Sequence, residues 1–128
     1  MASKSWTIDP TKFAALAEDE HKKLISAVGV DIGTRLIFKT PVDTGRAQNG
    51  WLPSIGAPAA GEGGVADPSG TTALSKIVST FRPNVLPNGP VLYVSNNVPY
   101  IGELNNGHSK QAPANFVGMA VSEVSDVL

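Results

Sequence analysis

Cysteine is absent from the 128 residues of this chain, which excludes disulfide bonds, thiolate metal sites and a cysteine nucleophile. Charged residues are few, at 16% of the sequence against about 25% in an average soluble domain. The net charge of −1 gives no excess of basic residues, so the electrostatic signature of a nucleic-acid-binding protein is missing. No stretch approaches the roughly 18 consecutive apolar residues of a membrane span. The segment from Met1 to Asp9 lacks an apolar run, so we expect no signal peptide and no membrane partner.

What is present fits one globular domain that spans residues 1–128. Hydrophobic residues make up 41% of the chain. A chain of this length buries roughly two thirds of the surface that it exposes when unfolded, so it can form its own core. A surface with few charges is also typical of a protein that covers part of itself with partners.

The N-terminal third predicts one long helix from Pro10 to Lys39. Asp9 can cap the first amides, and Pro10 suits the first helical position. Gly29 and Gly33 fall on the polar side of this helix, where they are either a tolerated weakness or a point of kinking or close approach. The apolar stripe near helical spacing consists of Phe13, Ala17, Leu24, Val28, Ile32 and Leu36.

The rest of the chain alternates short predicted elements with turns. We expect an extended segment from Arg46 to Leu52, a helix from Thr71 to Phe81 and a buried strand from Val91 to Val94. Trp51 would turn into the core or an interface. A helical turn from Pro99 to Asn105 and a last helix from Pro113 to Leu128 follow. These elements predict an α+β fold, with the long N-terminal helix and the C-terminal helix packed on a small antiparallel or mixed β-sheet.

The segment from Pro53 to Gly70 is rich in proline, alanine and glycine and has no periodicity. Long segments without structure inside a compact domain are usually functional or disordered. Two interpretations stay open: a surface loop, or an arm that becomes ordered against a neighbouring subunit.

Candidate catalytic patterns are weak. Asp43-Thr44-Gly45 is the tripeptide of aspartic proteases, in which two carboxylates of a homodimer share a proton. Here Thr40-Pro41 precedes the tripeptide and the bulky Arg46 follows it, so a local turn is the favoured interpretation. His21 and His108 have no metal-ligand spacing, and no base stands at a defined spacing from Ser109 to activate it. We therefore expect no enzyme, no catalytic residue, no metal and no cofactor.

Two segments resemble a known family. The first runs from Thr40 to Arg46, with Asn49-Gly50-Trp51 after it, and the second runs from Val91 to Ile101, with Glu103-Leu104, 107–113 and Phe116-Val117 after it. They contain a P-x-x-T-G-R turn, a strand that ends in N-x-x-P-Y, and a G-x-S-x-Q-x-P turn before a C-terminal helix. In this order they resemble the neck and tail-completion (head–tail joining, minor tail) proteins of long-tailed bacteriophages, over most of the chain.

The resemblance implies a structural virion protein, assembled in the cytoplasm of the bacterial host. Such a subunit forms a cyclic ring, expected to be a hexamer, as a tail terminator or an intermediate neck ring. It would meet the tail tube protein and a head-completion, connector or stopper protein, and genomic DNA would pass through its lumen without sequence reading. The alternatives are the homodimeric protease on Asp43 and a small DNA-binding module. The candidate interface residues are Arg46, Trp51, Val91, Tyr93, Tyr100, Glu103, Ser109 and Gln111.

Overall fold

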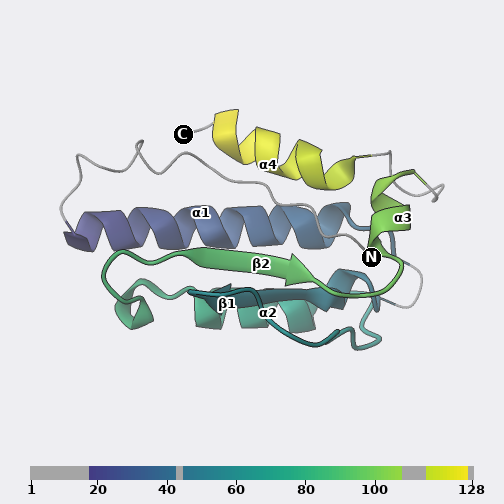
Figure 1. The fold of residues 1–128 in the computed structure, drawn as a ribbon, viewed down its shortest axis with the longest axis horizontal. Coiled ribbons are helices and arrows are strands. Elements are labelled where there is room, and N and C mark those ends of the chain that lie inside the picture. The colour runs from purple at the N-terminus through teal and green to yellow at the C-terminus, as the bar shows by residue number, and fades with distance from the viewer. Residues whose placement is uncertain (1–17, 43–44, 108–114, 127–128) are drawn as a thin grey trace.

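The computed structural model describes residues 18–42, 45–107 and 115–126. Its longest element is helix α1 (Glu18–Lys39), which runs along the length of the molecule in Figure 1. Helix α4 (Phe116–Asp126) packs on one side of α1, and the strands and helix α2 (Thr71–Thr80) lie on the other. The predicted α+β class is confirmed, with a long N-terminal and a C-terminal helix. The part of the first helix predicted before Glu18 lies outside the described residues.

The buried face of α1 agrees only in part with the predicted one, because Leu36 is buried and Ile32 packs against the core, but smaller residues are buried as well. Ser26, Gly29, Gly33, Ile37 and Thr40 lie on the buried side, although both glycines were expected on the polar side. A Cβ on Gly29 would lie 2.8 Å from Leu92 Cδ1 and 2.9 Å from Phe81 Cδ2. The glycines therefore allow close approach of neighbouring elements, which outweighs their low helix propensity.

The sheet consists of strands β1 (Trp51–Ile55) and β2 (Leu92–Asn96), paired antiparallel with Trp51 opposite Asn96. The extended segment predicted for 46–52 begins instead at Trp51, because 48–50 form a 3₁₀ turn, η2 (Gln48–Gly50). It continues to Ile55, so the first three residues of the predicted loop 53–70 belong to β1. Pro53 is tolerated in β1 because a strand with a single neighbour has one edge without ladder bonds.

Strand β2 is only half-buried along its whole length, so the prediction of a buried strand was wrong. Side chains alternate between the two faces of a sheet. The face with Trp51, Ile55, Leu92 and Val94 packs against the core. The other face carries Leu52, Ser54, Tyr93 and Ser95 and points outward.

The helices after the first were predicted, but the last two begin later than expected, at Ile101 instead of Pro99 and at Phe116 instead of Pro113. Helix α2 ends one residue earlier than predicted and buries Ala73 and Ile77. A 3₁₀ turn, η3 (Pro83–Val85), follows it, and the predicted helical turn after Pro99 is helix α3 (Ile101–Asn105). Helix α4 buries Phe116, Val117, Ala120 and Val124, a stripe of the predicted spacing. The core cluster comprises Leu36, Ile37, Ala47, Trp51, Ala73, Ile77, Phe81, Ile101, Phe116, Val117 and Ala120.

Candidate subunit interface

The turn that follows α1 is fixed by a hydrogen-bond chain. Thr40 Oγ1 donates to the carbonyl of Leu36 at 2.6 Å and accepts from Trp51 Nε1 at 2.7 Å. Only 5% of the Trp51 surface is exposed. The structure thus places Trp51 in the core, the first of the two places expected for it, with a satisfied indole N–H, so its surface is not open to a neighbouring subunit.

Asn49 is the polar centre of the same region and is 1% exposed. Its Nδ2 donates to the carbonyls of Gly45 and Asp67, at 2.8 and 2.6 Å. Its Oδ1 accepts from the N–H of Ala73 at 2.9 Å. One buried amide thus connects the turn after α1, the end of the long loop and the first turn of α2.

Asp67 completes the start of α2. Its Oδ2 accepts from the N–H and the hydroxyl of Thr72, at 3.0 and 2.8 Å. Its Oδ1 accepts from the hydroxyl and the N–H of Ser69, at 2.6 and 3.1 Å. The Ser69 hydroxyl, and after it the N–H of Thr72, lower the pKa of Asp67 to about 2. Because Asp67 and Asn49 satisfy the amides of Thr72 and Ala73, we assign this helix N-terminus a structural role rather than anion binding.

The two segments that carry the resemblance meet here. Asn96 Nδ2 donates to the carbonyl of Ala47 at 2.8 Å, and Asn96 Oδ1 accepts from the N–H of Val98 at 3.0 Å. Gly50 lies so close that a Cβ on it would collide with Val98 Cγ2. Residues 45–50 and 96–98, far apart in the sequence, therefore form one tightly packed unit.

Arg46 lies at the surface of this unit. Its guanidinium carbon is 5.9 Å from the centroid of the Tyr100 ring, a cation–π distance, and it forms an ion pair with Glu62. Asn97 Nδ2 donates to the carbonyls of Ala59 and Gly61, each at 2.9 Å. Two predicted interface residues, Arg46 and Tyr100, are thus in contact, and the long loop contacts Arg46 and Asn97.

The other predicted interface residues are dispersed or outside the described part. Val91 is 56% exposed just before β2, and Tyr93 is half-buried on the outward face of the sheet. Glu103 is exposed on α3. Ser109 and Gln111 lie outside the described residues, as do Asp43, Thr44 and His108.

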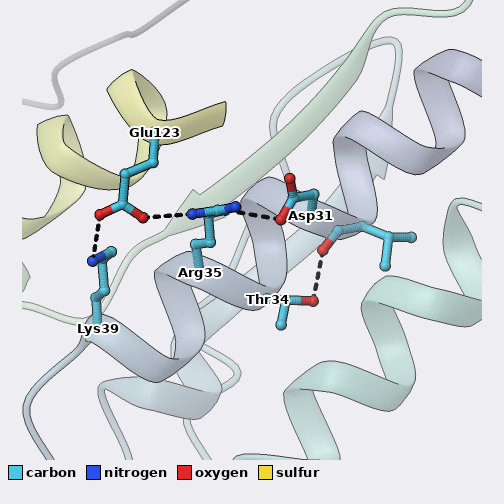
Figure 2. A network of polar contacts seen from close by, with 6 residues as sticks. Asp31, Thr34, Arg35, Lys39 and Glu123 are labelled. Atoms are coloured by element: carbon cyan, nitrogen blue, oxygen red, sulfur yellow. Dashed lines mark hydrogen bonds and ion pairs between the residues drawn. The ribbon is translucent and has the colours of Figure 1, made fainter. Parts of the chain in front are cut away.

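A network of charged side chains joins α1 to α4 (Figure 2). Glu123 accepts from Arg35 at 2.6 Å and from Lys39 at 2.7 Å, and Arg35 also pairs with Asp31 at 2.9 Å. Lys39 and then Arg35 lower the pKa of Glu123, and the bonds to Asp31 and Glu123 raise the pKa of Arg35. All four side chains are partly exposed, so the network orients α4 more than it stabilises it.

The described residues contain no group of three or more His, Cys, Asp or Glu that could hold a metal ion. None of the described helices combines the length and apolar character needed to cross a bilayer.

Gly45 has a φ of +89°, as the predicted turn requires. His21 lies half-buried on α1.

The sequence did not predict which polar side chains hold the long loop and the start of α2 in place. These are Asn49, Glu62, Asp67 and Asn97. Asp67 had a detectable signal, because an Asp a few residues before a helical stripe is typical of a capping residue. Asn97 donates to carbonyls more than 30 residues away in the sequence. No local pattern contains such contacts.

Comparison with protein-family models, with curated proteins and with solved structures found no match.

Proposed function

We propose that this chain is a structural virion protein of a long-tailed bacteriophage, which forms a ring at the head–tail junction or at the top of the tail. As a tail terminator or neck protein it joins the tail tube to the head connector, and DNA passes through the ring without sequence reading. Its action is binding, through copies of itself and axial neighbours.

One observation carries the proposal: the two segments that resemble the family contact each other in the fold. Asn96 binds the backbone of Ala47, and Arg46 lies over Tyr100. The residues on which the resemblance rests therefore contact each other in the fold. A chance match of two separate segments would not require such contacts.

The surface around this unit suits an assembly. Arg46, Tyr100 and Glu103 come from segments that meet there, and Arg and Tyr are enriched in the centres of interfaces. Val91 adds an exposed aliphatic side chain at the start of β2. Identical subunits that bind through two different patches close into a ring when the rotation allows it.

The test is the mass of the purified protein in solution, alone and mixed with isolated tail tubes. We expect a closed oligomer, with six copies as the leading expectation, that binds one end of the tube. Glu103→Arg should reduce ring formation at least tenfold, whereas Asp19→Arg, an exposed change on α1, should leave it within twofold. A protein that stays monomeric under all these conditions, or is absent from purified virions, contradicts the proposal.

A further inference from the structure

The segment 56–64, which we call the strap, lies over the surface around Arg46 and is held mainly by polar contacts. Asn97 donates to two of its carbonyls, and Glu62 forms an ion pair with Arg46. One apolar contact is added, because Gly63 lies against Leu52, where a Cβ would be 2.7 Å from Leu52 Cδ2. The strap thus occupies a defined binding site on its own chain.

We call that site the receptor, formed by Arg46, Asn97 and Tyr100. Its chemistry is specific: a carboxylate for Arg46 and two backbone carbonyls in register for Asn97. The guanidinium carbon of Arg46 also lies 5.9 Å from the centroid of the Tyr100 ring. Any segment that binds here must present a carboxylate close to two backbone carbonyls on a small-residue backbone, and the strap does so.

The strap buries little apolar surface. Its residues are glycine, alanine and proline apart from Glu62, and most of them are exposed, so release would give up little buried apolar area. Gly56 and Gly61 have positive φ values of +87° and +85°, and a Cβ on either would meet nothing within 4 Å. The base of the strap is held by two hydrogen bonds, from the N–H of Gly56 to the carbonyl of Val91 at 2.8 Å and from the hydroxyl of Ser54 to the carbonyl of Ala57 at 2.6 Å. Gly61 provides a hinge in its middle.

From these observations we infer that the strap exchanges between neighbouring copies, so that the receptor of one subunit binds Glu62 and the strap carbonyls of the next. This inference rests on the proposed ring. The contacts in a single chain already define the complementarity, and exchange of an identical element is a low-cost route to assembly. With residues 56–66 extended between β1 and Asp67, the tip of the strap reaches roughly 15–20 Å from its ends, enough to cross a subunit boundary. Removal of the strap also uncovers Leu52 on the outward face of the sheet.

A charge-swap experiment distinguishes exchange from a contact within one chain. Arg46→Glu and Glu62→Arg each place like charges at the contact, and each alone should form at least tenfold less ring than the native protein at the same concentration. An equimolar mixture should restore the ring to within twofold, because each strap then meets an oppositely charged receptor on its neighbour. If the contact forms within one chain, each variant keeps its pair of like charges, and mixing the two variants does not restore the ring.

The double variant R46E/E62R is the matched control, since it restores the charge pair in either arrangement and should assemble like the native protein. Single variants that assemble normally, or a mixture that stays unassembled while the double variant forms rings, would overturn strap exchange and leave the ring proposal intact. A native protein that never assembles would overturn both.

Discussion

Gly33 on α1 lies directly against Ile77 on α2. A Cβ built on Gly33 would stand 2.9 Å from both Cδ1 and Cγ2 of Ile77. Ile77 itself is fully buried, so it has no open space into which it could shift. The separation of the two helices at this point is therefore set by the absence of a side chain.

Gly33→Ala should destabilise the protein by about 1–2 kcal/mol. Overpacking of a filled core costs about 1–3 kcal/mol, whereas alanine in place of glycine inside a helix contributes at most about 1 kcal/mol. Urea denaturation followed by far-UV circular dichroism measures the difference. The sign is decisive, because a stabilised variant would mean that α1 and α2 are not in tight contact. Ala27→Gly, an exposed change on the same helix, gives the propensity effect alone, with a loss of about 1 kcal/mol.

Asn49→Ala should cost about 3 kcal/mol and loosen the start of α2. The substitution leaves the carbonyls of Gly45 and Asp67 and the N–H of Ala73 without their partner, and each unsatisfied buried group costs about 1–3 kcal/mol before water enters. Thermal unfolding measures the loss of stability, and amide hydrogen exchange at Ala73 reports the local opening. Asn84→Ala, an exposed change in η3, should stay within about 0.5 kcal/mol of the native protein. Equal effects of the two substitutions would contradict the role assigned to Asn49.

The sequence predicted those elements whose buried face is also their most apolar face. Helices α2 and α4 follow this rule, with Ile77 and Val124 on regular stripes. Helix α1 does not, because its closest contacts require small residues rather than apolar ones. Ser26 lies on that face and its hydroxyl binds the carbonyl of Phe81, a contact between residues 55 positions apart. Helical periodicity contains no information about such a contact.

The candidate site was predicted in part, for a similar reason. Arg46 and Tyr100 were named as candidate interface residues, and the structure brings them together. Trp51 was left between core and interface, and the hydrogen bond to Thr40 that places it in the core depends on how the chain returns after α1. The strap has a composition that predicts no structure by itself, and its order comes from Asn97 and Arg46, which are distant in the sequence.

Glu123→Gln should lower stability less than Val124→Ala, although both change the contact of α4 with the rest of the molecule. The ion pairs of Glu123 with Arg35 and Lys39 are partly exposed and screened by solvent. Val124 is 1% exposed, and truncation of a fully buried aliphatic side chain costs about 2 kcal/mol. Thermal unfolding of both variants, at low and at about 0.5 M salt, gives the comparison. Higher salt should reduce the difference in melting temperature between Glu123→Gln and the native protein, because salt screens the ion pairs. The difference between Val124→Ala and the native protein should not change. A larger loss for Glu123→Gln at either salt concentration would show that charge, not apolar burial, holds α4.

Asp67 should make the protein more stable at neutral pH than at acid pH. Its pKa in the folded protein is about 2, below its ordinary value of about 3.8, so the unfolded chain binds the proton first as the pH falls. The stabilisation is therefore complete above about pH 4 and is lost as the pH falls toward 2. Asp67→Asn should lower the melting temperature at pH 6, and its difference from the native protein should shrink steadily between pH 4 and pH 2. Ser69→Ala removes the largest cause of the shift, so it should move the pKa of Asp67 upward, as measured by the NMR titration of its carboxyl carbon. Two outcomes would mean that this carboxylate does not cap α2 in solution. One is a difference in melting temperature between the native protein and Asp67→Asn that does not depend on pH. The other is an Asp67 pKa that is the same with and without the Ser69 hydroxyl.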